Sequence, residues 1–360
     1  MAPPDPGPPG ADPPGIDCAA VARWLAPLVG GLEGPLRARI LEGGRSNLTY
    51  EIGDGNRVWV LRRPPLAHVL PTAHDMAREH RVLAALGPTD IPVPAVVGLC
   101  EDPGVLGAPF YVMGRVEGHV VRDALPAAYP DTPATRARIS AALVRTLTAL
   151  HAVDPSEVGL GDLGRPAGFL ERQVSRWWRQ WELSRTRDLP AIAELRSRLE
   201  AGVPVQSPPG IVHGDYRLDN LILAPDDPGR VAAILDWEMC TTGDPLADLG
   251  LLLVYWSDRT DPPSVIEHAL SPLTREAGFA TRDELAGAYA AASSRDLSAL
   301  DWYVCLGFFK LAVVAEGIHA RHLMGMTVGE GFDLMGPRVA GLVDSALARA
   351  SASSVPGLRG

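Results

Sequence analysis

The stretch HGDYRLDN, residues 213–220, places one histidine, two aspartates, one arginine and one asparagine in a polar turn directly after the apolar tripeptide GIV. Two apolar runs follow, NLIL (220–223) and VAAILD (231–236), and the segment APDDPGR separates them. Apolar runs on either side of such a turn predict a β-hairpin. The question is whether these polar side chains only solvate a loop or perform chemistry.

The spacing around the predicted hairpin favours chemistry. Asn220 and Asp236 stand eight residues before and after Pro228, near the expected centre of the turn, so we expect them side by side at the open end of the hairpin, with Asp215 close by. Two carboxylates and an amide oxygen suit Mg²⁺ carrying substrate phosphates better than zinc or copper. The alternative is that Asp215, Asp219 and Asn220 cap the turn locally and Asp236 only ends a strand.

Length and composition narrow the class of protein. At 360 residues the chain is longer than one hydrophobic core usually supports, so we expect two packed lobes. A formal net charge of −10 argues against nucleic acid as a partner, because phosphate backbones require a basic face. Four scattered cysteines lie among apolar neighbours without metal-type spacing and are predicted to be buried, reduced thiols: Cys18, Cys100, Cys240 and Cys305.

The basic residues are unusual, because only one of the 33 is a lysine, Lys310, in the apolar segment GFFKLAVV. A P-loop of the Walker type is therefore excluded, since no lysine follows a glycine-rich loop. Schiff-base chemistry would have this single candidate on an apolar helical segment, and the sequence does not favour it.

The two ends of the chain are predicted to be tails. Residues 1–15 are rich in proline and glycine and have neither a basic start nor an apolar run, so they predict a disordered tail and not a secretory signal. Residues 351–360 are expected to be a frayed tail. The longest apolar run, residues 249–256, is too short to span a bilayer, so we expect a cytoplasmic protein without a membrane partner.

Between the tails the pattern divides in two, which predicts an α+β protein. Residues 16–117 form the first lobe and residues 118–350 the second. In the first lobe, strand-like segments and two helices predict a small antiparallel sheet, with a GDGN turn in one hairpin: 17–31 and 74–86 as helices, 38–44, 46–53, 57–65 and 108–118 as strands. The second lobe is mainly helical, beginning with three amphipathic segments: 135–151, 168–185 and 188–201.

The second helix of the first lobe carries a carboxylate on its apolar face. Glu79 shares that face with Met76 and Leu83. A buried carboxylate without a partner costs several kcal/mol, so Glu79 should pair with a cation. The strand VWVLRRPP offers Arg62 and Arg63, which point to opposite sides of the sheet, and the sequence leaves open which of them is the partner.

The motif at 213–220 resembles the catalytic loop of kinases, in which an aspartate is followed five residues later by an asparagine and then by a second aspartate after the next hairpin. Here these positions are Asp215, Asn220 and Asp236. The variants HGD and LDWE, followed by GDPLADL, resemble the aminoglycoside phosphotransferase and choline kinase superfamily of small-molecule kinases. The similarity covers residues 38 to 325, and it implies a protein-kinase-like fold of two lobes.

This resemblance implies roles for individual residues. Asp215 would be the base, Asn220 and Asp236 would hold Mg²⁺, and His213 would support the loop. The nucleotide would be ATP, with GTP left open. Its binding site would include the bend at 42–50, the Arg62 and Glu79 pair, and the strand before the connection of the lobes: Gly43, Gly44, Ser46, Arg62, Glu79, Met113, Gly114 and Val116.

Other segments, including GGRSNLTY and the tryptophan-rich ERQVSRWWRQW, are similar to the branch of this superfamily that occurs fused to acyl-CoA dehydrogenases. The implied acceptor is a small-molecule hydroxyl, on an acyl-type metabolite or an aminoglycoside-like alcohol. A catalytically silent binding module of the pseudokinase type is the alternative. A protein kinase is less favoured, because Gly214 replaces the usual arginine and no A-P-E segment is present. We expect a monomer or a homodimer.

Overall fold

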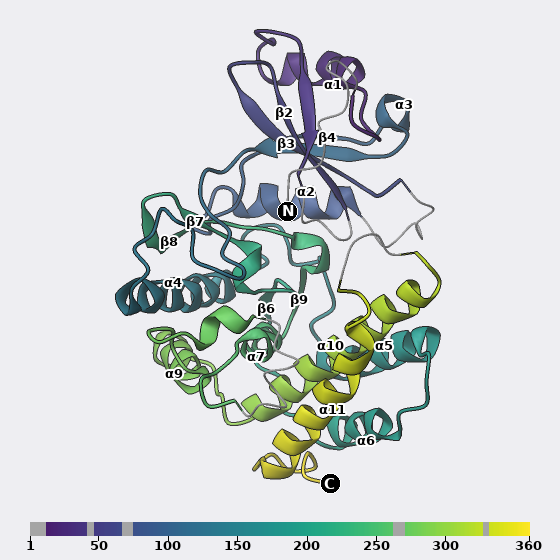
Figure 1. The fold of residues 1–360 in the computed structure, drawn as a ribbon, viewed down its shortest axis with the longest axis vertical. Coiled ribbons are helices and arrows are strands. Elements are labelled where there is room, and N and C mark those ends of the chain that lie inside the picture. Colours follow the sequence, from purple (N-terminus) through teal and green to yellow (C-terminus); the bar gives the residue numbers. More distant parts are fainter. Residues whose placement is uncertain (1–11, 42–46, 67–74, 262–270, 327–330) are drawn as a thin grey trace. The chain divides into compact units, whose positions relative to one another are not determined.

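The computed structural model describes residues 12–41, 47–66, 75–261, 271–326 and 331–360. The chain divides into two compact units (Figure 1). Unit 1 comprises Met1–Glu117 and the returning segment Ala232–Glu238, and unit 2 comprises Gly118–Val231 and Met239–Gly360. Asp236, which the sequence placed in the second lobe, therefore lies in unit 1.

Unit 1 is built on a five-stranded sheet in the order β1-β2-β3-β5-β4, and every neighbouring pair is antiparallel. Its strands are β1 (Arg37–Ile40), β2 (Leu48–Gly53), β3 (Val58–Arg63), β4 (Val96–Cys100) and β5 (Phe110–Gly114). The predicted GDGN turn joins β2 to β3, and Gly55 supplies its positive φ of 97°. The predicted small antiparallel sheet is therefore present.

Helices cover this sheet. The described helices of unit 1 include α1 (Cys18–Leu25), η1 (Ala26–Leu28), α2 (Met76–Leu86) and the single turn α3 (Pro103–Leu106). Asp17 caps α1 as predicted, but the α-helix gives way to a 3₁₀ turn at Pro27, whose ring cannot continue an α-helix interior. The helix α2 contacts β4 and β5, and its apolar stripe is buried together with Glu79.

The described part of the predicted N-terminal tail is packed. The amide of Cys18 donates to the Asp12 carboxylate at 2.8 Å, and the Tyr50 hydroxyl donates to the Pro14 carbonyl at 2.6 Å. Residues 12–15 therefore belong to the fold of unit 1, and the tail prediction is wrong for them. The turn chemistry of prolines and glycines could not reveal that a tyrosine 36 residues away would hold this segment.

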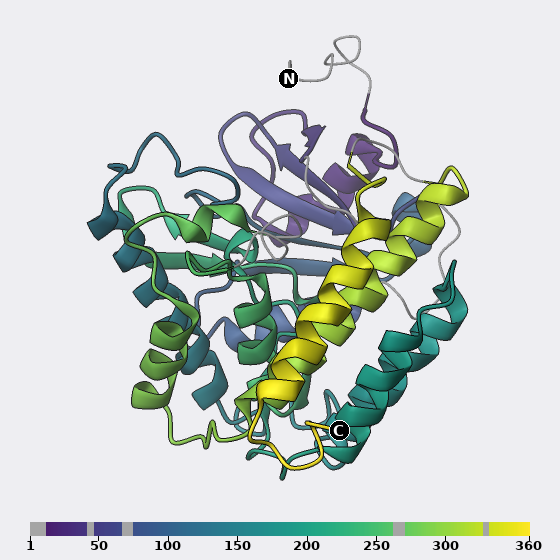
Figure 2. The same ribbon diagram turned by 60° about the horizontal axis from the view of Figure 1, so that its bottom comes forward.

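Unit 2 is mainly helical, as predicted. Its described helices include α4 (Pro133–Ala152), α5 (Phe169–Ser184), α6 (Pro190–Ala201), α7 (Leu246–Tyr255), α9 (Arg282–Ala292), α10 (Leu300–Leu323) and α11 (Met335–Ala352). The helices α10 and α11 lie side by side (Figure 2), and α10 also packs against α5 and α7. Among the described residues, α10 alone is long and apolar enough to cross a membrane by length and composition; 67% of that window is buried, as in a core helix.

Short strands carry the 213–220 loop. β6 (Gly210–Val212) pairs with β9 (Thr241–Gly243), and β7 (Leu221–Ala224) pairs with β8 (Asp227–Ile234). The second pair is the predicted hairpin, but β8 begins at Asp227, so the turn is the dipeptide Pro225-Asp226 and Pro228 lies within the strand. The predicted centre of the turn is therefore wrong, and the equal spacing about Pro228 does not explain how Asn220 and Asp236 would meet.

The C-terminal ten residues are not a frayed tail. The helix α11 continues to Ala352, and Val355 and Leu358 beyond it are buried. Leu358 packs at Gly202, at the end of α6, where a side chain on the glycine would meet the Leu358 backbone at 2.9 Å. The local sequence is polar and turn-like, and contacts with the distant end of α6 bury it.

Candidate active site

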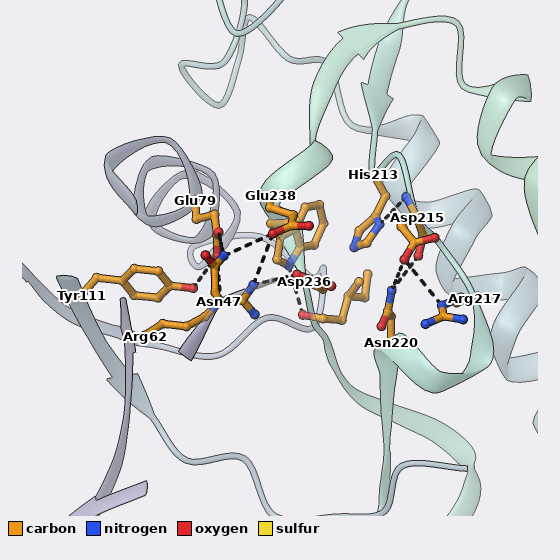
Figure 3. A network of polar contacts seen from close by, with 12 residues as sticks. Asn47, Arg62, Glu79, Tyr111, His213, Asp215, Arg217, Asn220, Asp236 and Glu238 are labelled. Atoms are coloured by element: carbon orange, nitrogen blue, oxygen red, sulfur yellow. Dashed lines mark hydrogen bonds and ion pairs between the residues drawn. The ribbon is translucent and has the colours of Figure 1, made fainter. Parts of the chain in front are cut away.

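A network of polar side chains in unit 1 centres on Arg62 of β3 (Figure 3). Nε of Arg62 lies 3.1 Å from Oε2 of Glu79, and its Nη2 donates to Oδ1 of Asp236 at 2.7 Å. The Tyr111 hydroxyl donates to Glu79 at 2.9 Å, and Asn47 donates to Glu79 at 3.0 Å and to Glu238 at 3.2 Å. We call this set the Arg62 network: Asn47, Arg62, Glu79, Tyr111, Asp236 and Glu238.

Burial governs the electrostatics of this network. Glu79 is 1% exposed, and burial raises the pKa of its carboxyl although Arg62 and the Tyr111 hydroxyl act in the opposite direction. Burial alone would lower the pKa of Arg62, but the charge of Glu79, followed by those of Tyr111 and Asp236, outweighs it and the pKa is raised. The buried carboxylate therefore has the cationic partner that the sequence required, and that partner is Arg62.

Arg63 points to the other side of the sheet. Its guanidinium donates to the carbonyl of Gly15 and, at 3.0 Å, to that of Leu106. These contacts tie the sheet to residues 12–15 and to α3. Of the two arginines on this strand, only Arg62 joins the carboxylate network.

Asp236 has an unusual backbone. Its φ of 66° lies in the left-handed region, and no other non-glycine residue in the described ranges has a positive φ. The segment is tied to unit 1 by the amide of Ile234, which donates to the Pro92 carbonyl at 2.8 Å. A non-glycine residue held in this conformation costs free energy, and such residues concentrate at functional sites.

The predicted nucleotide residues of β5 form a buried strand end. Met113 is buried and pairs with Val60 of β3. The amide of Gly114 already donates to the Ala95 carbonyl at 2.7 Å, so it is not available to the edge of a base; Val116 follows in irregular backbone. The other predicted phosphate contacts, Gly43, Gly44 and Ser46, lie outside the described residues.

In unit 2, both carboxylate oxygens of Asp215 accept hydrogen bonds from neutral groups. The Tyr255 hydroxyl donates to Oδ1 at 3.1 Å. Nδ2 of Asn220 donates to Oδ2 at 3.0 Å (Figure 3). The guanidinium of Arg217 is farther away, with its Nε 3.5 Å from Oδ2, and it stacks over the Tyr255 ring. Asp215 is thus oriented mainly by neutral donors.

The backbone of the 213–220 loop is held by a close steric contact and by hydrogen bonds. Gly214 has a φ of 87°, and a side chain at this position would meet Cβ of Met239 at 2.7 Å. Glycine therefore replaces the usual arginine for both a conformational and a steric reason. The amides of His213 and Gly214 donate to Asp248 at 2.6 and 2.8 Å, and Nδ1 of His213 accepts from the Asp215 amide at 3.2 Å. The supporting role predicted for His213 is confirmed.

Asp248 is itself held by a buried histidine. Nε2 of His151 lies 3.3 Å from Asp248, and its Nδ1 lies 2.8 Å from the Tyr289 hydroxyl. Burial lowers the pKa of His151, and the hydrogen bond and charge of Asp248 only partly oppose this. Burial raises the pKa of Asp248, but the hydrogen bond and charge of His151 and the Gly214 amide outweigh it, so its pKa is lowered.

The side-chain oxygens of Asn220 and Asp236 can be compared with the ligand atoms that Mg²⁺ prefers. Nδ2 of Asn220 donates to the Asp215 carbonyl at 2.8 Å as well as to its carboxylate, which leaves the amide oxygen as the ligand atom. That oxygen and the Asp236 carboxylate are hard donors of the kind that Mg²⁺ prefers, so the residues fit the ion. Asn220 belongs to unit 2 and Asp236 to unit 1, and that they hold one ion stays a prediction.

Several residues of these sites were not recognised from the sequence, among them Tyr255, Asn47 and Lys310. Tyr255 lies 40 residues from Asp215, and Asn47 lies 32 residues from Glu79. Neither belongs to a local motif. The sequence marks Lys310 as unusual, because it is the single lysine and stands on an apolar segment. In the structure its ammonium donates to the Gly214 carbonyl.

A family model described as the phosphotransferase enzyme family matches residues 37–303, most of the chain. The chain belongs to this family.

Among curated relatives, acyl-CoA dehydrogenase family member 11 of Rattus norvegicus is 36% identical over 320 residues, which are 87% of this chain and 40% of the relative. The chain thus spans well under half the length of the curated relatives that it matches. The predicted similarity to the branch related to acyl-CoA dehydrogenases is confirmed.

Solved structures agree. An aminoglycoside phosphotransferase-like protein of Ralstonia eutropha has a TM-score of 0.78 and 31% identity, covering 94% of this chain and 99% of its own. The aminoglycoside phosphotransferase APH(4)-Ia, in a ternary complex with AMP-PNP and hygromycin B, has a TM-score of 0.55 at 17% identity, covering 91% of this chain and 98% of its own, which shows the fold alone. The predicted α+β, protein-kinase-like fold is confirmed, and family membership supports a small-molecule phosphotransferase of the kinase type.

Proposed function

We propose that the protein transfers the γ-phosphoryl group of ATP to a hydroxyl group of a small molecule, with Asp215 as the base. The observation that carries the proposal is the environment of Asp215, whose two oxygens accept from Tyr255 and Asn220. Neutral donors orient a carboxylate without neutralising its charge, so it can accept the proton of an acceptor hydroxyl.

The Arg62 network supports the nucleotide side of the proposal. Glu79 is buried and fixed by Tyr111 and Asn47, so it holds the Arg62 guanidinium in one position. A fixed guanidinium beside carboxylates binds phosphate oxygens well, because its donors form a planar fork. Arg62 would contact the nucleotide phosphates, and Asp236, together with Asn220, would hold Mg²⁺. The bound ion would neutralise charge on the phosphates.

The acceptor is proposed from the relatives. Because the curated relatives are acyl-CoA dehydrogenase family members, a hydroxyl on an acyl-type metabolite is the first candidate. An aminoglycoside-like alcohol is the second candidate, since the solved structure from Ralstonia eutropha is described as that of an aminoglycoside phosphotransferase. A silent nucleotide-binding module remains the alternative from another class. It is disfavoured because a pure binder has no use for an aspartate positioned by two donors.

The proposal is tested with purified protein, Mg·ATP and Mg·GTP, and a panel of hydroxy acids, their CoA thioesters and aminoglycosides, with ADP and GDP release as the readout. Replacing Asp215 by Asn should reduce kcat about 10²–10⁴-fold, the usual contribution of a general base, and leave nucleotide affinity unchanged. Asp219→Asn is the matched control, because it removes another carboxylate from the same loop, one that pairs with Arg217 at 3.2 Å.

Two results would contradict the proposal. Turnover that survives in Asp215→Asn would remove the assigned base. Binding of Mg·ATP with no product from any acceptor would establish the silent module instead.

A further inference from the structure

Lys310 is a charged residue in an apolar setting. It stands on α10 between Phe309 and Leu311, both of which are buried, and is itself 9% exposed. Its ammonium group donates to the Gly214 carbonyl and lies 5.4 Å from the centre of the Trp177 ring. Burial lowers the pKa of Lys310, and the charges of Asp215 and Asp248 oppose that effect only in part.

This arrangement is not explained by stability. In the part of the chain that the structure describes, no carboxylate lies within ion-pair distance of the Lys310 ammonium. Burying an ammonium without an ionic partner costs free energy, and an apolar side chain of similar length would pack on α10 without that cost. Lys310 therefore serves the one group that it contacts strongly, the Gly214 carbonyl.

The backbone around Gly214 is held by opposite charges from two sides. The Asp248 carboxylate accepts from the amides of His213 and Gly214, and Lys310 donates to the carbonyl that follows. The same carbonyl belongs to the peptide group that joins Gly214 to Asp215. Its plane sets the direction in which the Asp215 side chain leaves the loop, and glycine, which adopts positive and negative φ with similar ease, does not fix that plane by itself.

We propose that Lys310 is a positioning residue, which fixes the Gly214–Asp215 peptide and thereby the orientation of the Asp215 carboxylate. Its effect on loop order follows from the contacts alone. Its effect on turnover rests on the proposed function, in which Asp215 is the base.

A small cavity next to this contact makes a chemical test possible. It holds about 50 Å³ and is lined by residues that include Trp177, Gly214, Asp248 and Lys310. Truncation of Lys310 to alanine would enlarge it by most of a side chain. Methylammonium is the smallest organic cation that could then enter and donate to the Gly214 carbonyl.

The experiment compares Lys310→Met, Lys310→Arg and Lys310→Ala with the wild type and with Arg179→Met, a control that removes an exposed cation from α5. Hydrogen exchange of the 213–216 amides is measured first, because it needs no acceptor. In Lys310→Met these amides should exchange at least tenfold faster, while amides of α4 and α6 keep the wild-type rate. With an acceptor in hand, kcat should fall at least tenfold and KM for ATP should change less than twofold.

A cation should restore both properties. Lys310→Arg, or Lys310→Ala with methylammonium in the buffer, should recover loop protection and at least part of kcat. Wild-type exchange of 213–216 in Lys310→Met would overturn the proposal. So would faster exchange throughout unit 2 that neither arginine nor methylammonium reverses, since that marks a loss of packing. If the wild type transfers no phosphate to any acceptor, the proposed function fails, and the exchange data still decide on Lys310.

Discussion

The carboxylates of the Arg62 network in unit 1 and the Asp215 carboxylate in unit 2 differ in their partners. In the network, one guanidinium faces the carboxylates of Glu79 and Asp236 at 3.1 and 2.7 Å, so the charges are paired with one another. In the loop, the Asp215 carboxylate accepts from a phenol and an amide, and its nearest guanidinium contact is 3.5 Å. Both carboxylate sites are ordered, but the carboxylates of Glu79 and Asp236 lie closer to a guanidinium than the Asp215 carboxylate does.

The difference separates binding from chemistry. Paired charges hold their own geometry, and the guanidinium among them can take up ligand phosphates without a large rearrangement. A carboxylate held by neutral donors is fixed in orientation and free of a close cationic partner, as a base that accepts a hydroxyl proton requires. Changes in the Arg62 network should therefore act mainly on stability and nucleotide affinity, and changes around Asp215 mainly on turnover.

The largest effect on stability is expected from Arg62→Met. The substitution leaves Glu79 buried without its cation, and breaking a mostly buried ion pair from one side costs about 3–5 kcal/mol. Affinity for ATP should fall as well. The free energy of unfolding is measured in urea, and nucleotide affinity by calorimetry.

The pH dependence of this variant identifies the cause. Burial already raises the pKa of Glu79 in the folded protein, and loss of Arg62 raises it further. A folded carboxyl with a raised pKa binds its proton more tightly than the unfolded chain does, so the folded state loses stability as the pH rises through the interval between the two values. The deficit of Arg62→Met should therefore be smaller at pH 5 than at pH 8.

Arg39→Met is the matched control, because Arg39 also pairs with a glutamate across strands, at 2.7 Å, but its side chain is 63% exposed. Its loss should cost less than about 1 kcal/mol. A deficit as large as that of Arg62→Met would show that burial does not distinguish the two pairs.

A smaller effect is expected from Tyr255→Phe, and it should fall on turnover and not on nucleotide affinity. The substitution removes the donor to Oδ1 of Asp215 and keeps the ring under Arg217. One hydrogen bond of this type contributes about 1 kcal/mol, so kcat should fall about fivefold, with KM for ATP unchanged. Tyr129→Phe is the control, since its hydroxyl donates at 2.5 Å to the Ala224 carbonyl and not to the loop. Loss of ATP affinity in Tyr255→Phe would contradict the division between binding and chemistry.

The parts of these two sites that the sequence predicted are those with a local signal. The position of Glu79 on an apolar helix stripe required a cation, and alternation along VWVLRR limited the choice to two arginines on opposite faces. The choice of Arg62 needed the sheet, because β5 places Tyr111 beside Arg62, where its hydroxyl reaches the same carboxylate.

Features that depend on distant contacts could not be predicted. No local pattern links Tyr255 to Asp215, or the single lysine to a carbonyl 96 residues away. The hairpin turn was misplaced because DDPG is a good turn sequence, whereas β8 accepts Pro228 near its start. The burial of the C-terminal segment could not be predicted because it depends on contacts with the end of α6, including Gly202.

The smallest effect concerns His151, two hydrogen bonds behind the Asp215 loop. Because burial lowers the pKa of His151 below its ordinary value of 6.5, the unfolded chain takes up a proton at a higher pH than the folded protein. The contribution of His151 to the free energy of unfolding should be fully present above pH 6.5. It should be lost as the pH falls, by at most about 1.4 kcal/mol per pH unit. His151→Gln should flatten the decline between pH 6.5 and 5, measured as the urea midpoint at each pH, whereas His119→Gln, which removes a half-exposed histidine, should not. Equal flattening in both variants would mean that the decline does not come from a buried histidine that its surroundings hold neutral.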